Sequence, residues 1–279
     1  MPNVTLKNRS QVFGYYDHNM LVMFERVSDH LPKKSKFTPR QRLWYIRAKE
    51  AILSTGSIER PIVFGNNDTP GVVLSSAAKE YMKVYGVAVG RKPIVFTNND
   101  SAYETAFEFK KNNIEPVILD TRQEHESEVI RTAKDKGIDI KFSHGVIKAN
   151  GYKKVKSAII GKLSKDKTSF EKTETIECDC ICVSGFWTPT VHLASQSGNK
   201  LKFDEKIDAF IPDKPKQKET TIGAANGSFT LKETIESGFK TGQELSKKIT
   251  NKNNDIKIPE NFGELNDGTH RRCFLEKDY

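Results

Sequence analysis

The segment RKPIVFTNNDSAYETAFEFKKNNIEPVILD, Arg91–Asp120, predicts a strand followed by a helix and a second strand. Lys92–Thr97 is a short run rich in β-branched and aromatic residues, and Asn98, Asn99 and Asp100 form a typical turn sequence. The next residues, SAYETAFEFKKNN, carry apolar side chains at helical spacing, and EPVILD returns as a strand. A strand, a helix and a parallel strand so close together form the half-unit of a doubly wound α/β sheet.

Further elements are expected on both sides of this unit. Upstream strands are expected at Gln11–Asp17, Leu21–Val27, Leu43–Lys49 and Glu50–Ser54. Downstream, a helix is expected over Glu124–Lys136, strands over Asp139–Phe142, Lys156–Gly161, Glu177–Ser184 and Glu219–Ala224, a polar hairpin loop over Lys162–Thr175, and a long amphipathic helix over Thr230–Ile249.

The composition excludes several classes of protein. The chain has 279 residues and a formal net charge of +9, but its lysines are scattered and are not interleaved with aromatic residues, so nucleic acid is not expected as a partner. No apolar run approaches the roughly 18–20 residues that cross a bilayer, and the N-terminus lacks the apolar core of a secretory signal. We therefore expect no membrane association and a cytoplasmic location.

The cysteines suggest neither a disulfide nor a metal site. Cys178, Cys180 and Cys182 alternate in the strand-like run TIECDCICVSG, which would place Cys178 and Cys182 on one face, roughly 13 Å apart and beyond disulfide reach. The C-x₂-C spacing of common zinc sites is absent from this segment. We expect these cysteines to be small apolar strand residues, and we expect no metal ligand in this chain.

Three junctions between a strand and a loop could contact a ligand. They lie in AILSTGSIERPIVF (Ala51–Phe64), VFTNNDSAY (Val95–Tyr103) and TIGAANGSFTLKETIESG (Thr221–Gly238). Small residues allow the backbone to approach a ligand closely, and a helix start offers free N–H groups to a phosphate. Each junction alone is common in α/β proteins, so the order of the three is more informative.

That order resembles the order found in the two-dinucleotide-domain flavoproteins. Several stretches of the sequence are also similar to the alpha subunits of heterotetrameric sarcosine oxidase. The matching stretches are VFGYYDHN (Val12–Asn19), RQRLWYIRAKEAILSTGSIERPIVFGNNDTPGVVL (Arg40–Leu74), YGVAVGRKPIVFTNNDSAYETA (Tyr85–Ala106), VSGFWTPTVHLASQSGNKLKFDE (Val183–Glu205) and GAANGSFTL (Gly223–Leu231). The resemblance implies an α/β fold of the FAD/NAD(P)-binding, glutathione-reductase-like type with an inserted Rossmann-like βαβ domain. The implied domains are an incomplete outer dinucleotide-binding domain (1–76 and 185–249), an inserted domain (77–184) and a polar tail or linker (250–279).

The resemblance also implies a function within a larger assembly. It implies NAD bound in this subunit, FAD in the beta subunit, FMN near the alpha–beta interface, and partner subunits beta, gamma and delta. The complex would oxidatively demethylate sarcosine to glycine, produce hydrogen peroxide and pass the one-carbon unit to tetrahydrofolate, a co-substrate of a separate domain. Two alternatives remain open: a subunit of a related FAD/NAD-dependent amino-acid or opine dehydrogenase, and a non-catalytic fragment acting only as an interaction module.

Matched residue by residue, the resemblance implies a set of cofactor contacts. They are Val12 near an adenine edge, Thr55, Gly56 and Ser57 close to the cofactor with Arg60 as a charge partner, Asn98, Asn99 and Asp100 toward the nicotinamide end, and Ala225, Asn226, Gly227 and Thr230 facing the nucleotide. Arg60 could equally form an ion pair with Glu59 or another acid. We assign no catalytic acid, base or nucleophile.

One departure from the family pattern concerns the phosphates of the cofactor. The sequence contains no G-x-G-x-x-G, and the turn of the inserted unit carries side chains at Thr97–Ala102 where glycines would stand. We expect the inserted domain to bind no dinucleotide of its own. A glycine-rich first βαβ unit is expected to be missing, as in a fragment or a split subunit, so NAD binding by this chain alone should be weak or absent.

Overall fold

The computed structural model describes residues 3–164 and 169–250, and their contacts divide them into two compact units. The first comprises residues 3–58 and 188–250, and the second comprises residues 59–187. The chain crosses between them in two short strands that pair with each other, β5 (Ser57–Glu59) and β14 (Trp187–Pro189). Of the expected polar tail, residues 250–279, all but the first residue lie outside the described residues.

The second unit is built on a five-stranded sheet in the order β6-β13-β7-β8-β9, in which the neighbouring strands are parallel. Its strands are β6 (Val72–Leu74), β7 (Pro93–Thr97), β8 (Val117–Asp120), β9 (Asp139–Phe142) and β13 (Cys180–Ser184). The connections contain α1 (Ser75–Tyr85), the 3₁₀ turn η1 (Asp100–Ala102), α2 (Tyr103–Lys111) and α3 (Glu128–Asp135). The strand–helix–strand unit predicted from Arg91–Asp120 is β7, α2 and β8.

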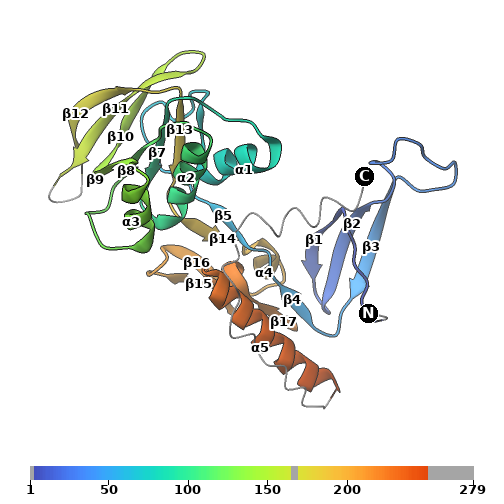
Figure 1. Ribbon diagram of the computed structural model, residues 1–279. Helices are drawn as coiled ribbons and strands as arrows, with labels where there is room; N and C mark the ends of the chain where they lie inside the picture. The colour runs from blue at the N-terminus through green and yellow to red at the C-terminus, as the bar shows by residue number, and fades with distance from the viewer. Residues whose placement is uncertain (1–2, 165–168, 251–279) are drawn as a thin grey trace. The chain divides into compact units, whose positions relative to one another are not determined.

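The five-stranded sheet is covered on both faces, which is the usual condition of a parallel sheet. An antiparallel sheet packs on one face; its strands are β10 (His144–Gly151), β11 (Val155–Leu163) and β12 (Phe170–Glu177). The three helices pack on the other face (Figure 1). Successive residues of β7 alternate between the two cores: Val95 packs with the helices, whereas Ile94 and Phe96 pack with the antiparallel sheet.

Two predictions in this unit are wrong in detail. The polar segment Lys162–Thr175 is not a loop throughout, because β12 begins at Phe170 and pairs with β11. The predicted strand Glu177–Ser184 is interrupted, since β12 ends at its first residue and β13 begins only at Cys180. Consequently Cys178 packs in the core beside the antiparallel sheet, while Cys180 and Cys182 face the helices with their Sγ atoms 3.5 Å apart.

The first unit contains three small sheets and a long helix. An antiparallel sheet is formed by β1 (Ser10–Tyr16), β2 (Met20–Arg26) and β3 (Gln41–Arg47); a parallel pair by β4 (Ala51–Leu53) and β17 (Glu219–Thr221); and a hairpin by β15 (Lys200–Asp204) and β16 (Ala209–Lys214). The helical elements are α4 (His192–Gln196), the 3₁₀ turn η2 (Gly223–Asn226) and α5 (Leu231–Thr250).

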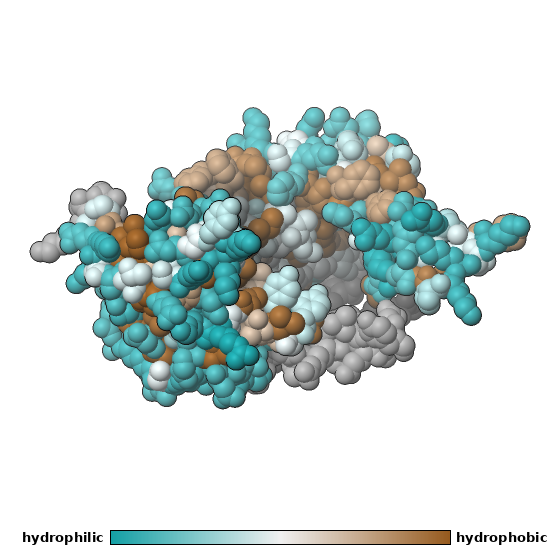
Figure 2. Space-filling view, turned by 90° about the horizontal axis from the view of Figure 1, so that it is seen from above, coloured by the Kyte–Doolittle hydropathy of each residue, from teal (hydrophilic) through white to brown (hydrophobic). Residues whose placement is uncertain are grey.

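The core of this unit is small. Tyr15, Ala51, Leu53 and Ala194 form its buried cluster, and Thr241 is the one buried residue of α5. Hydrophilic side chains cover much of the face shown in Figure 2, with hydrophobic ones between them. Within the described ranges, no helix is both long enough and apolar enough to span a bilayer.

Candidate functional site

The two turns predicted to hold a cofactor in the first unit lie at the same edge of its parallel sheet. β4 and β17 are neighbours in register, with Leu53 opposite Thr221, and Ile222 N donates to Leu53 O at 3.0 Å. Because both strands run in the same direction, the segment after β4 and the segment after β17 leave from one edge. Ligands of open parallel sheets bind at this carboxyl edge. The segments that carry Thr55–Ser57 and Ala225–Gly227 therefore leave the sheet from the same edge.

The first of these turns is held by Thr190, in the segment between β14 and α4, and presents open backbone. Thr55 Oγ1 donates to Thr190 O at 2.7 Å, and Thr190 N donates to Gly56 O at 2.9 Å. Gly56 has φ +71°, and a Cβ placed there would meet no atom within 4 Å. A residue of this conformation is best supplied by glycine, and the free space beside it leaves room for a ligand.

The second turn follows β17 as η2. Gly223 has φ +65° and Gly227 has φ +84°, Ala225 is buried and Asn226 is exposed. On β17 itself the side-chain oxygens Glu219 Oε2 and Thr221 Oγ1 are buried without a hydrogen-bond partner among the described residues. Buried polar atoms normally have partners, so an orphaned hydroxyl at the end of this strand fits a polar group supplied from outside.

Thr230 has a structural role at the start of α5. Its Oγ1 accepts from Glu233 N at 3.2 Å, and its own N–H donates to Glu233 Oε2 at 3.3 Å. This reciprocal pair is a capping box, and it occupies N–H groups that a phosphate would otherwise use. Glu233 also adds negative charge to the first helical turn. The start of α5 therefore suits the uncharged part of a nucleotide better than its phosphates.

Replacing Thr230 by alanine should lower the free energy of unfolding of the chain by about 1 kcal/mol, because Glu233 N loses its side-chain acceptor Thr230 Oγ1. Urea unfolding followed by helical circular dichroism would measure the change. Lys240→Ala, at an exposed position of the same helix, is the matched control and should change stability by less than about 0.5 kcal/mol. Equal losses in the two variants would show that the cap contributes nothing specific.

Val12, the remaining predicted cofactor contact of this unit, does not lie at the turns after β4 and β17. Val12 lies in β1 opposite Met23, beside a register shift between Val12 and Gly14, and so belongs to the antiparallel sheet. It is not at either turn of the parallel pair. Its predicted proximity to an adenine edge stays a prediction.

Arg60 and Glu59 are engaged with different parts of the second unit. Arg60 Nε donates to Gly185 O at 3.2 Å, and Arg60 N donates to Phe186 O at 2.8 Å. Glu59 is buried, and its Oε2 accepts from Ser76 N at 2.8 Å and Ser76 Oγ at 2.6 Å. Glu59 therefore caps the start of α1, a role that the sequence pattern did not reveal.

The turn after β7 is filled by its own side chains. Asn99 Oδ1 accepts from Ser101 N at 3.1 Å, and Asn99 Nδ2 donates to the backbone oxygen of Ser184 at 3.2 Å. Thr97 Oγ1 accepts from Asn99 N at 3.0 Å, and Asn98 lies exposed beside it. These bonds satisfy the helix start internally, which leaves little opportunity for a pyrophosphate to bind to the backbone here.

Asp100 joins a charged network at the same sheet edge. Arg122 NH2 lies 2.7 Å from Asp100 Oδ1 and 2.8 Å from Asp120 Oδ2, and Tyr103 OH donates to Asp120 Oδ2 at 2.9 Å. Asp120 is fully buried. Burial and the neighbouring carboxylate raise the pKa of Tyr103 well above its usual value, so its hydroxyl remains a donor at physiological pH. The network ties the turn to the end of β8 without a ligand. In the part of the chain that is described, no cluster of three His, Cys, Asp or Glu residues could hold a metal ion.

Known proteins resemble this chain both in sequence and in fold. No family model matches the sequence. Sarcosine oxidase subunit alpha of Corynebacterium sp. (strain P-1) is 34% identical over 237 residues, which are 84% of this chain and 24% of that subunit. The same subunit of Rhizobium meliloti (strain 1021) is 34% identical over 233 residues, 81% of this chain and 22% of the subunit. The chain thus spans about a quarter of the length of these relatives.

Solved structures confirm the predicted FAD/NAD(P)-binding type of fold. T. acidophilum thioredoxin reductase matches with a TM-score of 0.61 and 18% identity, covering 75% of this chain and 69% of that one. L-proline dehydrogenase from P. horikoshii matches with a TM-score of 0.57 and 22% identity, covering 86% and 41%. The sequence resemblance stated above is also confirmed, because the matched relatives are sarcosine oxidase alpha subunits.

Proposed function

The sarcosine oxidase alpha subunits are the family that this chain matches, and from that premise we propose that it forms part of an NAD-binding module in an oxidoreductase. The observation that carries this proposal is the shared edge of β4 and β17. There the open backbone of Gly56, the turn Ala225–Gly227 and the unpartnered Thr221 hydroxyl come from adjacent strands. The residues proposed to contact the nucleotide are Thr55, Gly56, Ser57, Ala225, Asn226, Gly227 and Thr230, with Val12 and Arg60 as further contacts.

We propose that the phosphates of NAD are bound by a glycine-rich turn that this sequence does not contain. The capping box at Thr230 and the acidic side chain of Glu233 leave the start of α5 poorly suited to a pyrophosphate. The self-capped turn at Asn98, Asn99 and Asp100 is likewise proposed to face the nicotinamide end without binding a dinucleotide of its own. Bound NAD would supply a site for hydride transfer, whereas the residues present here would orient it.

The wider role that we propose follows the matched subunits. The complex would contain beta, gamma and delta partners, with FAD in the beta subunit and FMN near the interface of the alpha and beta subunits. It would oxidise sarcosine to glycine with hydrogen peroxide as a product. A further domain would pass the one-carbon unit to tetrahydrofolate. The chain itself would position a cofactor and contact partner subunits, and it would contribute no catalytic acid, base or nucleophile.

The proposal is tested by nucleotide release. The chain is purified alone and together with a glycine-rich βαβ segment and a beta subunit from one of the matched relatives, then denatured, and the freed nucleotides are identified. We expect little NAD from the chain alone and close to one NAD per chain from the assembly. Stoichiometric NAD from the chain alone would contradict the proposal that a separate glycine-rich turn binds the phosphates. An assembly without NAD would contradict the proposed function.

Gly56 provides the residue-level test. Gly56→Ala should lower NAD affinity of the assembly by at least about 10-fold, because a side chain would occupy the space proposed for the cofactor. Gly86→Ala is a matched control: Gly86 has φ +64°, its added Cβ also meets nothing within 4 Å, and it ends α1 in the second unit. Both variants have the same backbone cost, so equal affinities for NAD would exclude Gly56 from the site.

A further inference from the structure

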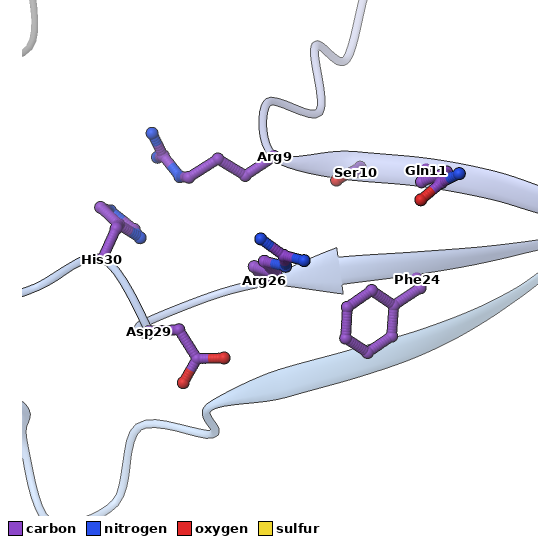
Figure 3. A pocket seen from close by; sticks show the side chains of 7 residues that line it. All are labelled: Arg9, Ser10, Gln11, Phe24, Arg26, Asp29 and His30. Carbon is purple, nitrogen blue, oxygen red and sulfur yellow. The ribbon is translucent and has the colours of Figure 1, made fainter. Parts of the chain in front are cut away.

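A pocket of about 500 Å³ lies where β1 begins and β2 ends, apart from the turns of the parallel pair. Three basic side chains line it, those of Arg9, Arg26 and His30, together with the ring of Phe24 and the carboxylate of Asp29. Figure 3 shows the basic side chains around the space beyond the two strand ends. Arg9, Arg26 and His30 are exposed, so a dissolved ligand could reach them.

The two arginines are placed against each other at a cost to the fold. Arg26 N donates to Arg9 O at 3.0 Å, which puts the residues directly opposite one another across the end of the β1–β2 pair. Like charges at opposite positions of neighbouring strands are destabilising. Arg9 also has φ +52°, a conformation that side-chain-bearing residues seldom adopt and that often marks functional positions.

The acid in the pocket does not neutralise these cations. Asp29 Oδ1 lies 2.8 Å from Arg40 Nε and 3.5 Å from Lys34 Nζ, and its other oxygen accepts from Gln41 Nε2 at 3.1 Å. The bonds from Arg40 and Gln41 hold the pKa of Asp29 down at about 2, so it stays ionised and occupied by these partners. Among residues 3–164 and 169–250, no carboxylate forms an ion pair with Arg9, Arg26 or His30.

At the adjoining position of the same sheet, in contrast, the basic side chains have an acidic partner. Glu25 lies one residue before Arg26 and compensates the cations around it, with Lys7 Nζ at 3.3 Å and Arg42 NH1 at 3.5 Å. Trp44 Nε1 donates to the same carboxylate at 2.6 Å. The cations around Glu25 are therefore paired with a carboxylate. At the next position, Arg26, where the pocket lies, the cations are not paired with any carboxylate of the described residues.

We propose that this pocket binds a phosphomonoester of a small organic molecule, with Arg9 and Arg26 donating to the phosphate oxygens. Guanidinium groups match phosphate oxygens in charge and in the geometry of paired hydrogen bonds. The pocket volume falls in the range of small-molecule sites, and the Phe24 ring offers an apolar wall to the organic part. His30 adds a further donor at the rim. The proposal is independent of NAD binding at the other sheet.

Titration calorimetry on the full chain, at fixed ionic strength set with chloride, tests the proposal with AMP and with inorganic phosphate. We expect saturable binding of both, with AMP at least about 10-fold tighter. No saturable binding of AMP would overturn the proposal, and so would equal affinities, because the organic part would then make no contact.

Variants separate the pocket from general positive charge. Arg9→Gln and Arg26→Gln should each weaken AMP binding at least about 10-fold, while Arg131→Gln, at an exposed position of α3, should leave it unchanged. Without AMP, both pocket variants should melt no lower than the parent, because an opposed like charge is removed. Equal loss of AMP binding in all three variants, or no loss in either pocket variant, would overturn the proposal.

Discussion

Replacing Arg122 by methionine is expected to lower the free energy of unfolding by about 3–5 kcal/mol, because it leaves a buried carboxylate without its cation. Asp120 has no exposed surface, and Arg122 Nε and NH2 lie 3.0 and 2.8 Å from its two oxygens. After the substitution, Tyr103 OH and the N–H of residue 122 are the donors that would remain to it within residues 3–164 and 169–250. Burying a charge with so little compensation is among the most costly changes a fold can undergo.

Urea unfolding of the full chain measures the effect. Arg131→Met is the matched control, since Arg131 is an exposed arginine and should tolerate the change within about 0.5 kcal/mol. A double variant, Arg122→Met with Asp120→Asn, should recover part of the loss because the buried charge is gone as well. If Arg122→Met unfolds at the same urea concentration as the parent, the network contributes no net stability.

The second large effect is expected at Phe109, whose side chain is fully buried between α2 and the parallel sheet. Phe109→Ala should cost about 3–5 kcal/mol, because it removes buried apolar surface and leaves a cavity that close-packed neighbours fill only in part. The loss should appear in the unfolding of the second unit, to which all of this core belongs. Hydrogen exchange of amides in β7 and β8 would report it directly.

Tyr152→Ala is the control for Phe109→Ala, since Tyr152 is an aromatic residue of the same unit with 89% of its surface exposed. It should alter stability by no more than about 0.5 kcal/mol. A small effect at Phe109 would mean that α2 can collapse onto the sheet. In that case the cost of the cavity would be recovered by rearrangement of its neighbours.

The parts of the fold that the sequence predicts well are those whose residues alternate or cluster by hydrophobicity. β7 and β8 consist almost wholly of apolar residues, and the predicted bounds of β9 are those of the structure. β12 was missed because FEKTETIE carries few apolar side chains: its residues are largely exposed, and backbone pairing with β11 holds it in place. A strand defined by its neighbour rather than by its own burial leaves little signal in its sequence.

The candidate site likewise has features that the sequence predicts and features that it does not. Glycines after a strand pointed to the turns at Gly56 and Gly227, and both have the positive φ values for which glycine is suited. The capping box of Thr230 and Glu233 could also have been found, because T-x-x-E before an apolar run is its signature. The orphaned hydroxyl of Thr221 and the cap formed by Glu59 could not, since each depends on contacts made only after folding.

The position of β13 has a consequence for how the chain folds during its synthesis. It is the last strand of its sheet in the sequence, yet it lies between β6 and β7 and all five of its residues are buried. A nascent chain that ends before Ser184 therefore cannot complete the middle of the sheet, however much of the earlier sequence has left the ribosome. Folding of this unit must wait for its final segment, and until then the facing edges of β6 and β7 are exposed to chaperones and to other nascent chains.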